Sequence, residues 1–340
     1  MNRRSLTSGL VVLAMVSLAG VAVAGQPSGT AEEPWTMPRT PDGRPDLQGV
    51  WANNSATPLE RPATFAGKAT LTEGEVAALT DAAGRLFGAA GDAAFGDGVF
   101  QAALANLEEN TSRDGGTGNY SSVWMVERDF DNRTSLITDP QDGKVPAMTP
   151  EGQQRQRAVL GRMLQSPSGP EDLILQVRCI TYGLPRVGGI VDAGYNSYYQ
   201  IFQTSDYVAI LAEMIHDVRI IPLGDRPHVR DSIRQWHGDS RGRWEGDTLV
   251  VETTNFSPKS NYRGASDNLH LIERFTRVGP QTLHYEITVA DPTTWTRQWT
   301  ARVPLRHTED AIFEYACHEG NYAMAGILAG ARAQEADAGR

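Results

Sequence analysis

Residues 246–255 read GDTLVVETTN, and this stretch decides the fold. A Gly-Asp turn leads directly into a run rich in β-branched residues, which is the pattern of a turn followed by a β-strand. Similar turn signals recur at residues 277–280, RVGP, and at residues 290–292, ADP. From Tyr207 to Trp299 the chain alternates apolar and polar residues in short segments of this kind. The region therefore predicts consecutive antiparallel strands, which at this spacing favour a barrel or a sandwich.

Helices are predicted outside this region, chiefly in the N-terminal half. Thr72 followed three residues later by Glu75 has the pattern of a capping box and predicts a helix that runs through Leu86. Residues 149–151, TPE, combine an N-cap, a proline at the first helical position and an acid in the first turn, so a second helix is expected to about Leu164. Shorter helical stretches are predicted at residues 99–107 and 323–333.

The N-terminus has the pattern of a secretory signal peptide. A charged start, MNRR, precedes an apolar run over residues 9–24 that ends in the small-residue sequence AVA. The run is shorter than the roughly 20 residues that a membrane-spanning helix needs. Residues 3–6, RRSL, leave open whether export follows the general or the twin-arginine route. Either route predicts a periplasmic or secreted protein.

The expected organisation has three parts. Residues 1–24 are a signal peptide, residues 25–45 an extended arm rich in Pro, Gly, Thr and Glu, and residues 46–340 a single β-rich domain with helical insertions near 72–107 and 149–164. Without the signal peptide the chain has 29 basic and 41 acidic residues, a formal charge of −12. Such a charge argues against nucleic acid as a partner. The expected partner is a small-molecule substrate or ligand, with no membrane span, and the oligomeric state is left undetermined.

Cys179 and Cys317 are the two cysteines of the chain. In an oxidising compartment an isolated pair predicts a disulfide, and a loop of this length is worth about 5 kcal/mol in the chain-entropy model. The bridge would bring Tyr182 close to His318 and Glu319. The alternative, a nucleophilic Cys179, has no local signature in its favour.

Several strings resemble a family of secreted bacterial proteins that are mostly uncharacterised, and the resemblance covers most of the chain after the signal peptide. The resemblance implies export and a β-barrel similar to that of the lipocalins, and it brings no catalytic roles with it. The expected fold is accordingly mainly β, an antiparallel lipocalin-like barrel with a few peripheral helices. The strings are PDGRPDL at 41–47, GVW at 49–51, TSLI at 134–137, DP at 139–140, EMIHD at 213–217 with Arg219, GDS at 238–240, GRWEGDTLV at 242–250 and YACHEGN at 315–321.

The densest group of ionisable residues is Glu213, His216, Asp217 and Arg219. On an uninterrupted strand, alternation places Glu213, Asp217 and Arg219 on one face and His216 on the other. Inside a barrel, Arg219 would hold a substrate anion, while His216 would transfer a proton from a strand end. The competing interpretation is a structural Asp217–Arg219 pair and a histidine satisfied within the core.

A second group, His318 and Glu319, follows Cys317 directly. A disulfide would pin this segment, and a pinned histidine suits proton transfer, although a polar segment fixed for stability explains it as well. A metal site is a third possibility, with candidate ligands His216, Asp217, His318 and Glu319. No metal-binding spacing is present among them, so neither a metal nor a cofactor is predicted. Residues 238–242, GDSRG, are expected to form a hairpin loop rather than a nucleophile turn.

Aromatic residues offer a lining for a ligand. Tyr195, Tyr198 and Tyr199 crowd a Gly/Asn-rich loop, and Trp295 and Trp299 have the spacing of one strand face. Such side chains suit an aromatic or terpenoid ligand, because they combine apolar area with a hydrogen-bonding tip. An ordinary barrel core explains the two tryptophans equally well.

Two functions follow from these residues. The first is a cofactor-independent lyase (a decarboxylase, deformylase or cyclase) for a small hydrophobic or aromatic molecule. In it Arg219 anchors an anion, His216 or His318 moves a proton, and Glu213 or Asp217 orients the imidazole. The second is a non-catalytic periplasmic carrier of a similar ligand. A third possibility, a module of a larger assembly, would require an exposed apolar patch.

Overall fold

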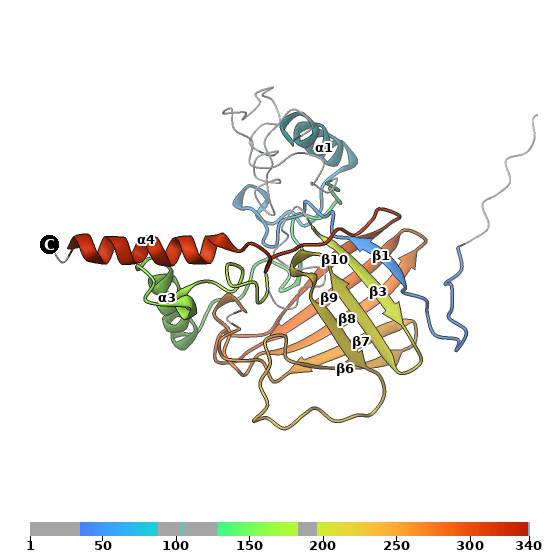
Figure 1. Cartoon of the computed structure of the whole chain (residues 1–340). Coiled ribbons are helices and arrows are strands. Elements are labelled where there is room, and N and C mark those ends of the chain that lie inside the picture. The colour runs from blue at the N-terminus through green and yellow to red at the C-terminus, as the bar shows by residue number, and fades with distance from the viewer. Residues whose placement is uncertain (1–34, 88–103, 105–127, 183–195, 261, 339–340) are drawn as a thin grey trace, which may run out of the picture. The chain divides into compact units, whose positions relative to one another are not determined.

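The computed structural model describes residues 35–87, 104, 128–182, 196–260 and 262–338. Its strands form one curved, 10-stranded antiparallel sheet in the order β5-β4-β3-β1-β10-β9-β8-β7-β6, with β2 paired to β10 (Figure 1). The strands are β1 (Gly49–Ala52), β2 (Ile137–Asp139), β3 (Tyr198–Gln203), β4 (Tyr207–Ala212), β5 (Val218–Pro222), β6 (Asp239–Glu245), β7 (Thr248–Thr254), β8 (His270–Gly279), β9 (Thr282–Ala290) and β10 (Trp299–Thr308).

The predicted mainly β, antiparallel fold is confirmed, but the strand ladder does not close into a barrel. β5 and β6 are the two ends of the strand order. Within the described residues they meet at one parallel bridge, Leu223 to Gly242, beside which the Gly224 N–H donates to the Gly242 carbonyl at 3.1 Å. This junction is called the β5–β6 seam below.

The core lies on the inner face of the sheet, where apolar side chains alternate with polar ones that face outward. On β9, for example, Leu283, Tyr285, Ile287 and Val289 are fully buried. Burying a side chain of this size stabilises the fold by roughly 1.5–3 kcal/mol. The Trp51 indole N–H donates to the Leu47 carbonyl at 2.9 Å, which satisfies the one polar atom of a fully buried ring.

The described helices are α1 (Glu73–Phe87), α3 (Pro150–Met163) and α4 (Tyr322–Ala338). The capping box of α1 is confirmed, because the Glu75 carboxylate accepts from the Thr72 N–H at 2.8 Å while the Glu75 N–H donates to the Thr72 hydroxyl at 3.3 Å. At the start of α3 the Thr149 hydroxyl accepts from the Gly152 N–H at 3.0 Å. No described helix has both the length and the apolar character needed to cross a membrane.

Some expectations lie outside the described residues: the signal peptide 1–24, residues 25–34 of the arm and all of the helix 99–107 except Leu104. The predicted domain boundaries therefore stay predictions.

Two local expectations about strands are wrong. Residues 213–217 do not continue a strand, because β4 ends at Ala212 and a 3-10 turn, η4 (Met214–His216), intervenes. Ile215 and His216 have φ angles of 61° and 46°, so side chains no longer alternate there. Residues 239–242 belong to strand β6 rather than to a hairpin loop.

The disulfide between Cys179 and Cys317 is confirmed, with a Cα–Cα distance of 5.7 Å. It ties the segment before β3 to the segment after β10. Tyr182, Tyr315 and Cys317 pack around the buried side chains of Met214 and Ile215. The C-terminal segment is thereby fixed against the turn between β4 and β5.

Candidate functional site

The candidate site lies at the β5–β6 seam. At this seam the backbone of Gly242 lies close to the side chains of Leu223 and Ile221, and there is no room for a side chain at position 242. A Cβ at Gly242 would lie 2.7 Å from a Leu223 methyl carbon and 2.9 Å from one of Ile221, so only glycine lets β5 lie this close to β6. The seam site is defined here as Asp217, Arg219, His228, His237 and Asp239.

Arg219 forms a buried ion pair with Glu273 of β8. Its two terminal nitrogens donate to the two carboxylate oxygens at 3.0 and 2.7 Å, and one of them also donates to the Ser240 hydroxyl at 3.2 Å. The Tyr285 hydroxyl donates to Glu273 at 2.9 Å. The side chain of Glu273 is fully buried and that of Arg219 is 6% exposed. Arg219 is thus already paired, and its predicted role as an anion anchor stays a prediction.

This pair changes the proton affinity of its neighbours. Burial, followed by the Glu273 charge, raises the pKa of Tyr285 well above its usual value. Burial likewise raises the pKa of Tyr262, which lies in η5 (Tyr262–Gly264). For Arg219, burial lowers the pKa, but the Glu273 carboxylate outweighs it and raises the pKa. The cluster therefore holds one positive and one negative charge with two neutral phenols.

Asp217 and His237 form the most accessible acid–base pair of the site. Asp217 Oδ2 lies 3.3 Å from His237 Nε2, in ion-pair contact but outside hydrogen-bond geometry. Their side chains are 25% and 23% exposed. Asp217 directly precedes β5, the strand that carries Arg219, and Arg219 reaches Ser240 on β6. The pair and the buried ion pair are therefore neighbours.

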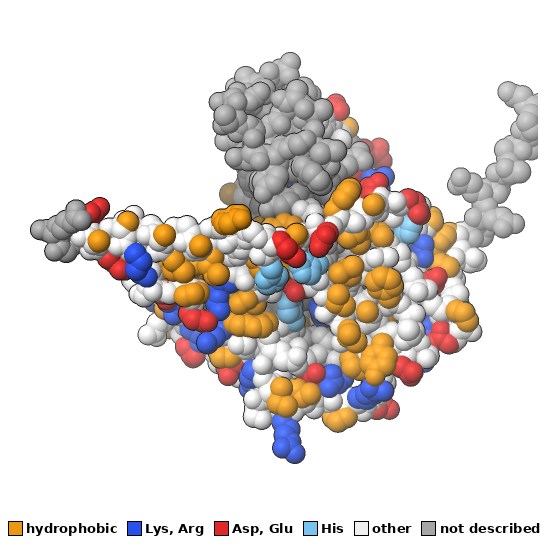
Figure 2. Space-filling model, in the orientation of Figure 1, with side chains coloured by type: hydrophobic (Ala, Val, Ile, Leu, Met, Phe, Trp, Pro, Cys, Tyr) orange, Lys and Arg blue, Asp and Glu red, His pale blue; other side chains and the backbone are white. Residues whose placement is uncertain are grey.

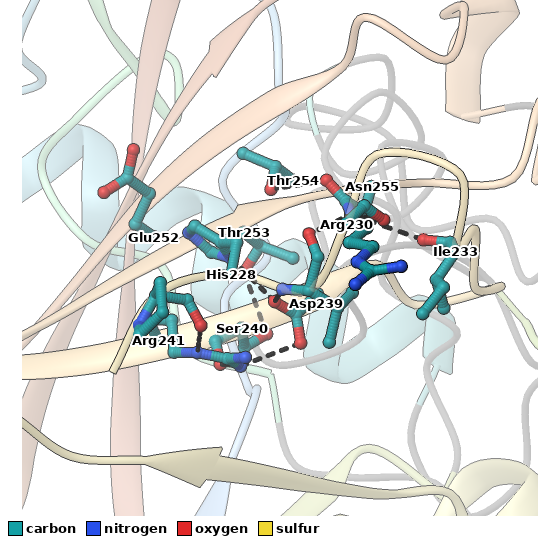
Figure 3. Close-up of polar contacts among 12 residues, drawn as sticks. His228, Arg230, Ile233, Asp239, Ser240, Arg241, Glu252, Thr253, Thr254 and Asn255 are labelled. Carbon is teal, nitrogen blue, oxygen red and sulfur yellow. Dashed lines mark hydrogen bonds and ion pairs between the residues drawn. The ribbon is translucent and has the colours of Figure 1, made fainter. Parts of the chain in front are cut away.

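His228 and Asp239 form a second pair. Asp239 Oδ2 is 2.8 Å from His228 Nδ1 and accepts from the Val229 N–H at 3.1 Å, and its other oxygen accepts from Arg241 at 2.7 Å (Figure 3). The buried amide of Asn255 donates to the carbonyls of the same loop. Figure 3 shows this amide pointing toward the loop, and the acceptors are Val229, Arg230 and Ile233, at 3.1–3.3 Å. The loop before β6 is thus held at both ends.

Gly238 separates His237 from Asp239 and brings the loop against β7. Its φ is +67°, and a Cβ there would lie 2.5 Å from the Thr254 carbonyl oxygen. An L-residue at this position would push the backbone away from β7. Glycine therefore positions both histidine pairs of the site.

Of the residues predicted around η4, only Asp217 and Arg219 belong to the seam site. Glu213 is buried and accepts from the backbone N–H of Phe313 at 2.9 Å, so it fastens the C-terminal segment. His216 is exposed, its Nδ1 lies 2.8 Å from the Tyr315 carbonyl, and its ring centroid is 6.2 Å from that of His318. Glu319 is exposed. Figure 2 shows histidine side chains gathered beside acidic ones on this face.

The described residues among the predicted aromatic lining lie in different surroundings, and their role in ligand binding stays a prediction. Tyr199 and Trp299 are buried in the core, and Trp295 precedes β10 rather than sharing its face, with the two tryptophan rings packed edge to face at 5.9 Å. The Tyr198 hydroxyl donates to Asp310 at 2.8 Å. Tyr195 lies outside the described residues.

Four buried polar atoms of the seam site make no hydrogen bond with any residue that the structure describes. They are Asp217 Oδ2, Arg219 Nε, His228 Nε2 and His237 Nδ1. Buried polar atoms in folded proteins are nearly always paired, with protein or with water. Four such atoms in one site indicate that a further polar partner, such as water, would complete it.

Two cavities lie away from this site. One, of about 310 Å³, is at the far end of the seam and is lined by Arg44, Ser205, Asp206, Leu223, Gly224, Arg243 and Trp244. The other, of about 280 Å³, lies on the outer face of the sheet. In the residues described, no three His, Cys, Asp or Glu side chains are arranged to hold a metal ion.

The fold and the site together define an antiparallel β protein with acid–base side chains beside a buried Arg–Glu pair. No protein-family model, curated protein or solved structure matches this chain.

Sequence reasoning missed His228, His237 and Glu273. The two histidines lie in a loop without periodicity, although the position of His237 just before Gly238-Asp239 was an available signal. Glu273 comes 54 residues after Arg219, and only the pairing of β8 with β7, and of β7 with β6, brings it to the site.

Proposed function

We propose that this chain is a periplasmic, cofactor-independent enzyme of the lyase class, acting on a small hydrophobic or aromatic molecule by general acid–base catalysis at the seam site. We also propose that its curved sheet works as a lipocalin-like barrel. The observation that carries the proposal is the group of four buried polar atoms of the seam site that make no hydrogen bond with any described residue.

His237 is the proposed proton carrier. Histidine is the side chain that most often transfers protons at neutral pH. The Asp217 carboxylate, 3.3 Å from His237 Nε2, lies against this side of the ring. Nδ1 is buried and unpaired within the described chain, so it is the nitrogen left to face a substrate.

The surroundings favour a substrate of low charge. Arg219 is the buried cation of the seam site, and the carboxylate of Glu273 already neutralises its charge. The inner face next to Arg219 is apolar, with Ala212 and Ile221 fully or almost fully buried. A strongly charged ligand would lose its hydration there without gaining a counter-charge.

The test begins with native mass spectrometry, followed by denaturation and extraction of any retained molecule. Turnover is then measured with that molecule, or with a panel of aromatic acids, aldehydes and terpenoids if none is retained. His237→Gln should lower kcat about 10²–10⁴-fold, because it removes the proton carrier but keeps the size of the side chain. His270→Gln is the matched control, since His270 is paired with Glu252 at 2.8 Å on the outer side of β8, and it should leave kcat unchanged.

Equal turnover by the His237→Gln variant and the wild type would remove the seam site from the mechanism. A retained molecule that no variant converts would favour the carrier. One observation favours that second function: the buried Trp299 indole N–H makes no hydrogen bond with any described residue, so it can donate to a ligand. In a carrier, Trp299→Phe should weaken binding while His237→Gln leaves it intact.

A further inference from the structure

The outer face of the sheet carries a groove of about 280 Å³ that the seam site does not use. Strand register builds it in two rows. Thr248, Thr276 and His284 lie side by side across β7, β8 and β9, and Arg274, Glu286 and Arg302 lie side by side across β8, β9 and β10. Val278 completes the lining.

His284 is the one polar side chain of the groove for which the described chain supplies no partner. The two threonine hydroxyls are 2.8 Å apart. Arg274 donates to Glu245 at 2.8 Å, and Arg302 donates through two nitrogens to one oxygen of Glu286 at 3.2 and 3.0 Å. The half-buried imidazole thus has one N–H and one lone pair that no described residue uses. It lies in the same row as the hydroxyls of Thr248 and Thr276.

Cations surround this imidazole. Burial, then the charges of Arg302 on β10 and of Arg133 before β2, lower the pKa of His284, while Asp131 and Glu286 act in the opposite direction. Arg274 lines the groove from β8. Because every arginine has a carboxylate neighbour, the groove is close to neutral while His284 is uncharged. One added proton makes it a cationic site.

We propose that this groove binds a small oxyanion, a carboxylate or a tetrahedral anion such as sulfate or phosphate, together with one proton. The anion accepts from the imidazole N–H and from the guanidinium N–H groups of Arg302 and Arg274 that the two glutamates leave unused. An anion between the guanidinium groups offsets their repulsion of an imidazolium, so binding and protonation of His284 strengthen each other.

The test is a histidine-edited NMR titration of the full chain, with the His284 signals assigned by their loss in His284→Gln. Sodium sulfate and sodium acetate are the probes, because neither anion titrates between about pH 5.5 and 7.5. We expect a saturable shift at His284, and binding several-fold tighter at about pH 6 than at about pH 7.5. A shift at His284 with either anion supports the site. Comparing sulfate with acetate then shows whether the groove prefers a tetrahedral or a planar anion.

Arg302→Gln should abolish the anion-induced shift, and by removing a positive charge it should raise the pKa of His284 in the absence of anion. The second effect shows that the variant is folded and that the electrostatic geometry is right. Arg297→Gln is the control, since Arg297 is paired with Asp139 and does not line the groove, and it should change neither property. No shift with either probe, or the same shift in Arg302→Gln, would overturn the proposal.

Discussion

The Arg219–Glu273 pair is costly to bury and costly to break. Two charges out of water lose hydration that their mutual attraction repays only when hydrogen bonds complete the geometry. Tyr285 and Ser240 supply such bonds here. The stability of the ion pair therefore depends on both charges and on these two hydrogen bonds together.

Glu273→Gln should cost about 3–5 kcal/mol in the free energy of unfolding, because it leaves a buried guanidinium without its counter-charge. Tyr285→Phe removes one hydrogen bond to a charged group and should cost about 1.5–3 kcal/mol. Urea denaturation at neutral pH measures both. Asp247→Asn, which breaks a half-exposed pair with Arg39, is the control and should cost less than about 1 kcal/mol. A Glu273→Gln cost no larger than that of the control would show that water reaches the pair.

At this scale the sequence was informative only locally. Alternation placed Asp217 and Arg219 on one side, which stays a prediction because Asp217 precedes β5. It failed for Glu213 and His216, because the positive φ angles of η4 turn the chain between them and β5. Nothing in an unaligned sequence signals such a turn at Ile215, since β-branched residues rarely adopt positive φ.

Asp291 joins several elements at the turn after β9. One of its oxygens accepts from the Ser266 N–H at 2.7 Å, the Ser266 hydroxyl at 2.9 Å and the Thr294 hydroxyl at 2.6 Å, and the other accepts from the Thr293 N–H at 3.0 Å. Burial raises the pKa of Asp291, but these hydrogen bonds outweigh burial and lower it. The carboxylate thus stabilises the fold only while it is ionised.

Asp291→Asn should lower the free energy of unfolding at about pH 7 by about 2–3 kcal/mol, because an amide N–H₂ replaces an acceptor that faces donors. The folded pKa lies below the ordinary value of about 3.9, so the wild-type advantage is complete above that value and disappears as the pH falls through the folded pKa. Urea denaturation at about pH 7 and about pH 3 compares the two proteins. An advantage equally large at both pH values would contradict the hydrogen-bonded carboxylate. Asp139→Asn, which breaks an exposed pair, should show no such convergence.

Among the elements, those with strong local signals were predicted well. The caps of α1 and α3 and the turn before β7 appear where the sequence indicated them. β6 was mistaken for a loop because its first residues are polar. Asp239 and Ser240 are nevertheless buried, since their side chains find His228 and Arg219 as partners from elsewhere in the chain.

The disulfide acts on the whole molecule, because strands β3 to β10 all lie within the loop that it closes. Replacing both cysteines, Cys179→Ser with Cys317→Ser, should lower the free energy of unfolding by about 2–5 kcal/mol. Guanidinium denaturation with and without reductant measures this. The reduced wild type is the internal control and should match the double variant. An unchanged midpoint on reduction would mean that packing around Met214 and Ile215 alone holds the C-terminal segment.

The strand order was beyond sequence reasoning. Consecutive strands pair along β3–β4–β5 and β6–β7–β8–β9–β10, as a meander predicts, but the two groups meet through β1 rather than directly. β1 is only four residues long, and its position depends on neighbours 146 or more residues away in the chain.

That placement has a consequence for how the protein is made. β1 emerges early, yet its partner β10 is the last strand of the sheet to leave the ribosome. Until then β1 can pair only with β3, and its other edge, like the edge of β9 that later pairs with β10, remains available to any passing chain. Synthesis therefore passes through a stage in which most of the molecule is present but the sheet is split in two. A holdase, or folding delayed until β10 is made, would protect the two open edges at that stage.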